Sequence, residues 1–538
     1  MELAKNQEHT VTIEGYGEGG MGVARIDGRV VFVHGALRGE KCRVLILKTL
    51  KSVAFAKVLE VLEPSSERIT PDCPYFPRCG GCTYRHIRYE EELRLKKQRV
   101  QDNLSRIGGS DVTVEEILGA QDTLRYRNKA QYPVSKDGAV GFYRARTHEV
   151  IECEHCLLVK PEADAAAEAL REYMQSCRVA GYDEKTGRGL VRHLYVRSNA
   201  AGESLVCVLV NGDKLPKEDR LVTLLRDACP KCTGIVLGTN TKKGNVILGD
   251  RYRTLWGSDR LEDTLCGKTF RLSVPSFYQV NRVQAERLYA KAIEFAGLTG
   301  QETVLDLYCG AGTITLALSD HAKKVLGAEI VPEAIDDARE NAARNGVKNA
   351  EFFCGDASDV AKKLARENLR PDVITVDPPR KGLAADVVES IAEMQPGRVV
   401  YVSCDSATMA RDVKRLADLG YTAQRACAVD MFPRADHVET VCLLVLRNPV
   451  THINIDVDVE EMVQDKRGLA TYGQIKAYVL EHTGLKVSSL YIAQVKQKCG
   501  IIERENYNKP KSDDARQPQC PLDKERAITE ALKHFGML

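Results

Sequence analysis

Alternating apolar and polar positions open the chain and predict a small β-barrel. Strand-like runs between residues 10 and 62, such as residues 29–33 and 41–47, are separated by glycine-rich turns. Residues 15–20 formally match a dinucleotide-binding glycine fingerprint, but strands follow them rather than a helix. We therefore interpret these glycines as turn residues and expect the barrel to occupy residues 1–64.

The pattern then changes to helices mixed with strands. A charged helix is predicted over residues 84–106, and strands and helices mix over residues 120–265, so we expect a central domain at 65–270. An amphipathic helix over residues 282–298 leads into regularly alternating strands and helices. Such alternation predicts an α/β domain at 271–448, with an open parallel sheet and helices on both of its faces.

The last segment, residues 449–538, is predicted to be a separate helical annex. Residues 475–480 and 527–535 have helical patterns, and residues 508–512 have the composition of a loop. No chemical motif is found in this annex, and its role is not predicted.

Composition indicates a soluble protein of several domains. A chain of 538 residues is too long for one core, and its 43% hydrophobic and 28% charged residues are ordinary for globular proteins. The N-terminus has no signal-peptide core, and no apolar run approaches the roughly 18 residues of a membrane span. We therefore expect a cytoplasmic protein without a membrane partner, and no obligate protein partner is evident.

Basic residues gather locally although the net charge is only +2. The predicted helix at 84–106 has seven of them, which would suit either phosphate contacts or a solvated helix face. Basic and aromatic residues also interleave at 125–129 and 142–146, a mixture that suits looped or single-stranded RNA as well as ordinary amphipathic strands.

Eighteen cysteines in a cytoplasmic protein should be mostly free thiols, metal ligands or catalytic groups. Cys73, Cys79 and Cys82 form a C-x5-C-x2-C loop, and three thiolates so placed can hold an iron–sulfur cluster or zinc. A fourth ligand must come from elsewhere, and Cys153 and Cys156 are the nearest candidates.

Two strands of the predicted sheet carry acids beside a glycine turn. The first, residues 303–308, contains Asp306 and runs into Cys309-Gly310-Ala311-Gly312, while the second, residues 324–329, ends in Glu329. Glycines let the backbone approach a cofactor closely, Asp306 can orient an amino acid portion, and the second acid can accept both ribose hydroxyls. An NAD enzyme usually has three glycines in G-x-G-x-x-G spacing, so S-adenosylmethionine is favoured.

The following strands end in groups suited to chemistry. Residues 372–376 precede Asp377-Pro378-Pro379-Arg380, either a rigid functional turn or a plain β-turn. Residues 398–402 precede Ser403-Cys404, which places a cysteine at the edge of the sheet that faces the cofactor crevice. His437 and Glu439, just before the last strand, are both candidates for a general base.

Taken together, these residues resemble the RNA uracil-5-methyltransferase family, in the branch that acts on 23S ribosomal RNA. The resemblance covers residues 10 to about 447. Its motifs are Ser276-Phe277-Tyr278-Gln279-Val280-Asn281, the turn at 306–312, Asp377-Pro378-Pro379-Arg380, Ser403-Cys404 and His437-Val438-Glu439-Thr440. It implies a class I (Rossmann-like) methyltransferase domain after an OB-like TRAM barrel and a central α/β RNA-binding domain.

The resemblance also implies an activity, S-adenosylmethionine-dependent methylation of carbon 5 of a specific uridine in 23S rRNA. That carbon is too weak a nucleophile unless a thiolate first adds to carbon 6, and a base must later remove the carbon 5 proton. The resemblance implies that Cys404 is the nucleophile and Glu439 the base. Because the uridine must leave its stack to reach the cysteine, base flipping is expected. By resemblance, the pocket is lined by Gln279, Tyr308, Glu329 and Asp377, and a [4Fe-4S] cluster is held by Cys73, Cys79, Cys82 and Cys156.

Two departures from the family pattern keep alternatives in view. The nucleophile is followed by Asp405-Ser406 where the family usually has Asn-Pro, and Ala435 stands where threonine is common. A carboxylate that pointed toward Cys404 would raise its pKa. The alternatives are a methyltransferase for the T-loop of transfer RNA, a non-catalytic RNA-binding or redox-sensing relative, and a cytosine-5 RNA methyltransferase. The last usually has a cysteine where this chain has residues 378–380.

Overall fold

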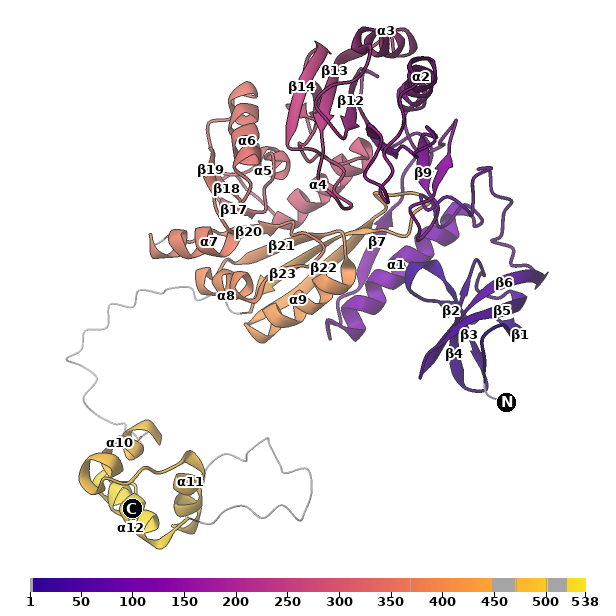
Figure 1. Ribbon diagram of the computed structural model, residues 1–538. Coiled ribbons are helices and arrows are strands. Elements are labelled where there is room, and N and C mark those ends of the chain that lie inside the picture. Colours follow the sequence, from indigo (N-terminus) through magenta and orange to yellow (C-terminus); the bar gives the residue numbers. More distant parts are fainter. Residues whose placement is uncertain (1–2, 368, 448–469, 471, 500, 502–519) are drawn as a thin grey trace. The chain divides into compact units, whose positions relative to one another are not determined.

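The computed structural model describes residues 3–367, 369–447, 470, 472–499, 501 and 520–538. The chain divides into two units, residues 1–450 and residues 451–538, and each is described by itself (Figure 1). Among the described residues, no helix combines the length and the apolar character needed to cross a lipid bilayer.

A six-stranded barrel-like sheet begins the first unit, in the order β1-β5-β6-β4-β3-β2. Its strands are β1 (Glu8–Thr12), β2 (Gly15–Tyr16), β3 (Gly22–Ile26), β4 (Arg29–His34), β5 (Lys41–Thr49) and β6 (Val53–Glu63). Alternate residues such as Val31, Val33 and Ile46 form a closed apolar core, as period-two patterning requires. Gly19 and Gly20 lie in a short 3-10 turn that leads into β3 and have positive φ, as predicted for turn residues, whereas Gly15 belongs to strand β2.

The central part of the unit is a five-stranded sheet in the order β14-β13-β12-β11-β8, with two helices (Figure 1). These elements are β8 (Lys129–Pro133), β11 (Val191–Ser198), β12 (Ser204–Val210), β13 (Cys232–Thr239), β14 (Arg251–Gly257), α2 (Pro161–Cys177) and α3 (Glu218–Ala228). Two hairpins flank the sheet, β9 (Gly141–Tyr143) with β10 (Val150–Glu152) and β15 (Arg260–Leu265) with β16 (Lys268–Ser273).

An eight-stranded sheet forms the third part, in the order β19-β18-β17-β20-β21-β23-β22-β7. Its strands are β17 (Thr303–Leu307), β18 (Lys324–Glu329), β19 (Ala350–Cys354), β20 (Val373–Val376), β21 (Arg398–Ser403), β22 (Tyr421–Val429), β23 (Glu439–Leu446) and β7 (Val114–Leu118). The strands from β19 to β21 are parallel, whereas β23 runs antiparallel to both β21 and β22. This is the predicted doubly wound α/β fold, and its central strands are buried on both faces, as parallel strands require.

Helices cover both faces of this sheet (Figure 1). One face packs against α4 (Arg282–Ala296), α5 (Thr313–Leu318) and α6 (Pro332–Arg344). The other packs against α7 (Ala357–Arg366), α8 (Ala385–Met394), α9 (Ser406–Asp418) and α1 (Tyr89–Arg106). Between these two apolar layers, the parallel strands β17, β18, β20 and β21 all end at one edge of the sheet, where the loops that follow them meet.

Two elements from the predicted central domain belong structurally to this sheet. Strand β7 pairs in parallel with β22 at the edge, and α1 contributes Val100 and Leu104 to the core beneath α9. The domain boundary at residue 270 remains a prediction, but residues 89–118 pack with the sheet of the domain predicted to begin after it.

The second unit contains three described helices around their own apolar core. They are α10 (Tyr472–Thr483), α11 (Ser489–Lys498) and α12 (Leu522–His534), and the two predicted helical patterns lie within α10 and across the end of α12. The predicted loop at residues 508–512 lies outside the described residues.

Candidate active site

The turn after β17 is built around a buried carboxylate. Asp306 is 1% exposed and accepts hydrogen bonds from the hydroxyls of Thr315 (2.5 Å) and Thr375 (2.8 Å). It therefore ties β17 to α5 and β20, whereas the sequence suggested only contact with the amino acid portion of a cofactor. Gly312 has φ +82, and a Cβ there would lie 3.2 Å from Ala338, so this turn needs glycine.

Glu329 lies at the carboxyl end of β18, beside that turn. Its carboxylate accepts from the backbone N–H of Gly310 at 3.2 Å and of Val331 at 3.0 Å, which fixes its direction. An added Cβ at Gly310 would meet nothing within 4 Å, and the adjacent Ile330 side chain is 61% exposed. Open backbone, an oriented acid and an exposed apolar side chain together suit a nucleoside with a hydroxylated sugar.

Strand pairing brings Cys404 and Glu439 together. Ser403, the last residue of β21, pairs with Thr440 of β23 in antiparallel register, and one further step in this register places Cys404 opposite Glu439. Cys404 is partly buried, whereas Glu439 is only 4% exposed. Cys404 and the carboxyl group of Glu439, separated by 35 positions in the sequence, thus lie at the same end of two paired strands.

The site contains more carboxyl groups than cations. Burial raises the pKa of Asp306 to about 6, and burial with the charge of Asp306 raises the pKa of Asp377 to about 7. Burial and then Asp377 raise the pKa of Glu439 to about 8, which Arg380 partly opposes. Burial, Glu439 and Asp377 raise the pKa of the Cys404 thiol to about 11. Such a site is electrostatically suited to a bound cation.

Asp405, the departure from the family pattern, caps a helix. Its side chain accepts from the backbone N–H of Ala407 (2.9 Å) and Thr408 (3.0 Å) at the start of α9. The carboxylate therefore faces the helix, and it contributes the smallest of the causes that raise the pKa of Cys404. Ala435, the other departure, is buried, and its N–H donates to the carbonyl of Phe432 at 3.0 Å.

His437 occupies a different position from Glu439. Its Nε2 lies 3.2 Å from Nη2 of Arg380, and its side chain is 43% exposed. Burial and Arg380 lower its pKa, and Asp436 opposes this. Of the two candidate bases, the buried Glu439 is the one whose charge acts on Cys404.

A cavity of about 1220 Å³ is lined in part by Cys404. Its walls come from the N-terminal barrel, from α1 and from the start of α9; they include Tyr16, Arg38, Arg94, Lys97, Arg99, Arg106, Arg380, Cys404 and His437. The sequence predicted the basic helix but gave no signal that the barrel and Cys404 share one cavity with it.

The basic residues of the charged helix region have different roles. Arg94, Lys97, Arg99 and Arg106 line the cavity, whereas Arg85 and Lys96 are buried in ion pairs with carboxylates. In the segment 125–129, Arg125 donates to Asp164 at 2.6 Å and Tyr126 donates to the carbonyl of Pro433 at 3.0 Å. The sequence pattern alone could not separate these structural residues from exposed ones.

Tyr308 and Gln279 are the remaining residues predicted to line the pocket. Tyr308 adopts φ 68 directly after β17, and burial and neighbouring carboxylates raise its pKa to about 12. Gln279 is buried in the segment before α4, where its carbonyl accepts from Asn128 at 2.9 Å.

The predicted cluster cysteines share a second cavity. Cys73, Cys79, Cys82, Cys153 and Cys156 line a space of about 210 Å³, and the buried Arg85 donates to Sγ of Cys82 at 3.4 Å. Among the described residues, no three Cys, His, Asp or Glu side chains are arranged to hold a metal ion. The structure thus brings the cysteines to one cavity without forming a single-ion site, and it does not choose between Cys153 and Cys156.

Comparisons with known proteins agree over most of the chain. A family model described as tRNA (uracil-5-)-methyltransferase matches residues 88–447, and a TRAM domain model matches residues 3–59. An uncharacterized RNA methyltransferase of Clostridium acetobutylicum is 41% identical over 82% of this chain and 98% of its own length. Another, from Halalkalibacterium halodurans, is 43% identical over the same shares.

Among solved structures, the chain is similar to the Pyrococcus abyssi tRNA (uracil-54, C5)-methyltransferase in complex with S-adenosyl-L-homocysteine. The TM-score is 0.66 and the identity 27%, over 81% of this chain and 100% of that one.

Proposed function

Because the chain belongs to the tRNA (uracil-5-)-methyltransferase family of S-adenosylmethionine-dependent enzymes, we propose that it methylates carbon 5 of a uridine in RNA through Cys404 and Glu439. The observation that carries this proposal is the cross-strand juxtaposition of Cys404 and Glu439 beside Asp377.

In this mechanism the Cys404 thiolate adds to carbon 6 of the uracil, and the electron pair of the carbon 5–carbon 6 double bond moves into the ring as an enolate. Carbon 5 then takes the methyl group that the bound sulfonium cofactor supplies. The Glu439 carboxylate removes the proton from carbon 5, and the bond between sulfur and carbon 6 breaks as the double bond re-forms. The carboxyl-rich site supports this assignment because it offsets the positive charge of the donor.

The residues around the turn fit the cofactor. Glu329 is directed by two backbone N–H groups to accept the ribose hydroxyls, and Gly310 leaves open space beside the turn. Tyr308, Gln279 and Asp377 are proposed to line the cofactor or substrate pocket.

RNA is proposed to bind in the cavity between the barrel, α1 and Cys404. Its basic wall can contact phosphates, and Tyr16 offers a ring at the same cavity. A uridine that flips out of its stack would enter where Cys404 and His437 line the wall.

We propose 23S rRNA as the substrate, on the combination of a TRAM barrel with the cysteine cavity. A T-loop uridine of transfer RNA is the second candidate, favoured by the similarity to the archaeal tRNA enzyme. Nucleoside analysis of separately purified ribosomal and transfer RNA, from cells with and without the gene, distinguishes the two.

The same nucleoside analysis tests the chemistry. Loss of 5-methyluridine on deletion, and its restoration by the purified enzyme, support the proposal. A change in 5-methylcytidine would instead indicate a cytosine enzyme, and no change in either would indicate a non-catalytic relative.

The cysteine cavity is proposed to hold a [4Fe-4S] cluster on Cys73, Cys79, Cys82 and Cys156. Among the described residues, no three Cys, His, Asp or Glu side chains are placed to hold a single ion such as zinc. A cluster with four thiolates is larger and anionic, which suits a cavity also lined by Arg85, Arg127 and Lys129. Iron and sulfide analysis of protein purified without oxygen tests this assignment.

A further inference from the structure

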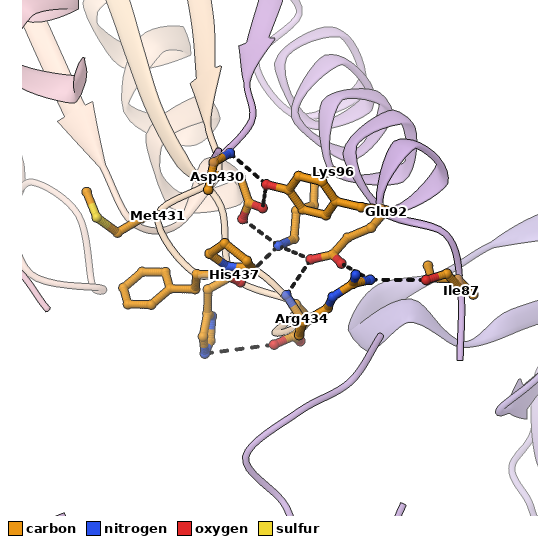
Figure 2. Close-up of polar contacts among 12 residues, drawn as sticks. Ile87, Glu92, Lys96, Asp430, Met431, Arg434 and His437 are labelled. Atoms are coloured by element: carbon orange, nitrogen blue, oxygen red, sulfur yellow. Dashed lines mark hydrogen bonds and ion pairs between the residues drawn. The ribbon is translucent and has the colours of Figure 1, made fainter. Parts of the chain in front are cut away.

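The segment between β22 and β23, residues 430–438, carries Asp430, Arg434 and His437 (Figure 2). Glu439, the first residue of β23, follows it directly. If Glu439 is the base, the conformation of this segment determines where its carboxyl group lies relative to Cys404. Most of the contacts that hold the segment come from other parts of the chain.

Lys96 of α1 makes the central contact. Its Nζ donates to Oε1 of Glu92 at 2.8 Å, to Oδ1 of Asp430 at 2.6 Å and to the carbonyl of Phe432 at 3.1 Å (Figure 2). The side chains of Lys96, Glu92 and Asp430 are all 0% exposed. A fully buried ammonium group with three oxygen partners is fixed in position, because any movement leaves a buried charge without a partner.

The surrounding groups complete this network. Glu92 also accepts from the backbone N–H of Arg434 at 2.7 Å and faces its guanidinium at 3.5 Å. Tyr89 donates its hydroxyl to Asp430 at 2.6 Å. Two cations, Lys96 and Arg434, thus face two carboxylates, Glu92 and Asp430, so the buried cluster is balanced in charge.

The backbone of the segment depends on such external contacts. Arg434 has φ 70, a left-handed conformation that arginine rarely adopts, and its carbonyl accepts from the N–H groups of Thr83 (2.7 Å) and Tyr84 (3.0 Å). Asn281 donates to the carbonyl of Met431 at 3.1 Å. The segment has no regular structure of its own, so these contacts define its shape.

Helix α1 also contacts the other side of the catalytic pair. Asn103, two turns after Lys96, donates to the hydroxyl of Ser406 at 2.8 Å, two residues beyond Cys404. One helix from the N-terminal half therefore holds both the segment before Glu439 and the segment after Cys404.

We propose that Lys96 is a positioning residue for the reaction, whose ammonium group holds segment 430–438 so that Glu439 faces the carbon 5 proton of the Cys404-bound uracil. This inference rests on the proposed function. The base acts only after methyl transfer, so loss of positioning should slow release of the product from Cys404 more than it slows formation of the covalent adduct.

The test is single-turnover methylation of substrate RNA with a labelled methyl donor, in which the denaturant-resistant protein–RNA adduct is followed with time. For Lys96→Met we expect adduct formation close to that of the wild type and adduct breakdown slowed by roughly 10- to 100-fold. Rates are expressed per adduct-forming site, so unfolded protein does not contribute. A purely structural role would lower the number of such sites and leave the breakdown rate unchanged, and that result would overturn the proposal.

A second variant guards against failure to fold. In the triple variant Lys96→Met, Glu92→Gln, Asp430→Asn, the two carboxylates that Lys96→Met alone would leave unpaired are replaced by neutral amides. This variant still lacks the ammonium contact with Phe432, so slow breakdown of the adduct is again expected. Wild-type breakdown in this folded variant would contradict the inference. The matched control is Lys291→Met in α4, which removes a lysine paired with Glu116 of β7 and Glu294 of α4; neither carboxylate contacts segment 430–438 in the described hydrogen bonds, so breakdown should not change.

Glu439→Gln, measured in parallel, separates the role of Lys96 from that of the base. If it accumulates methylated adduct while Lys96→Met does not, only the role of Lys96 is wrong. If Glu439→Gln accumulates none, the proposed base and the inference that depends on it both fail.

Discussion

Glu439 faces Cys404 across the ends of β21 and β23, one step beyond the residue pair Ser403 and Thr440. This placement has an electrostatic consequence, because Glu439 is the largest cause after burial of the raised pKa of Cys404. The charge of Glu439 disfavours the ionised form of the Cys404 thiol. A cation bound beside Glu439 would weaken this effect, so we expect binding of the donor to favour ionisation of the thiol.

Removal of the thiol tests the nucleophile directly. Cys404→Ala should lower methyl transfer by at least about 10³-fold, because it removes the thiolate that adds to carbon 6, while donor affinity changes little. Transfer of labelled methyl to RNA and calorimetry of donor binding measure the two effects. Cys177→Ala, a partly buried cysteine at the end of α2, is the matched control and should keep full activity. Substantial activity in Cys404→Ala would refute the mechanism.

The pKa of Glu439 predicts how stability depends on pH. Because its pKa in the folded protein, about 8, is above the unfolded value, the group stabilises the fold below about pH 4.5 and this contribution is lost as the pH rises through 8. Glu439→Gln should therefore be more stable than the wild type at pH 9, on the order of 2 kcal/mol, and no more stable at pH 4.5. Denaturant unfolding at the two pH values measures this, and a pH-independent difference would contradict the assignment.

The cap formed by Asp405 allows its charge to be separated from its structural role. Asp405→Asn keeps a favourable N-cap for α9 but removes a negative charge near Cys404, so the thiol pKa should fall and alkylation at neutral pH should become about two- to threefold faster. Asp405→Ala should instead cost about 1 kcal/mol of stability. Iodoacetamide kinetics, with Cys404→Ala as the blank, and thermal unfolding distinguish the effects. Unchanged reactivity in Asp405→Asn would mean that the carboxylate has no influence on the thiol.

The two glycines of the cofactor turn should respond differently to alanine. Both have positive φ, so each change costs about 1 kcal/mol, but only at Gly312 would the added Cβ press on Ala338 and Phe352. At Gly310 the Cβ would enter open space, where the donor is proposed to bind. We expect Gly312→Ala to lower stability more and Gly310→Ala to weaken donor binding more. Thermal unfolding and calorimetry of donor binding provide the comparison, and equal effects at both positions would argue against a donor site beside the turn.

The basic wall of the large cavity should appear in the salt dependence of RNA binding. Lys97→Gln and Arg106→Gln should each weaken RNA binding. The slope of log affinity against log salt concentration should also become less steep, by about 0.7 for each phosphate that the variant no longer neutralises. Arg220→Gln, an exposed arginine of α3 paired with Glu172, should change neither quantity. If the cavity-lining variants matched this control, the RNA would have to follow another path.

Much of this architecture could be predicted from the sequence because its signals are local. The alternation of β4 and β5, the buried runs of β17 and β20 and the glycine turn at Gly310 and Gly312 are each encoded within a few residues. The motifs around Asp377, Cys404 and Glu439 placed the chemistry at the carboxyl edge of the sheet, since parallel strands end there in any doubly wound fold.

The tertiary structure alone decided which charged side chains are available. Lys96 and Lys97 are neighbours in one charged helix, yet Lys96 is buried against Asp430 and Lys97 lines the large cavity. Helical periodicity separates the faces of a helix, but it does not identify the partner that covers a face. For Lys96 this partner, Asp430, lies more than 300 residues away in the sequence. Burial and pairing depend on contacts between distant segments, and these arise only when the chain has folded.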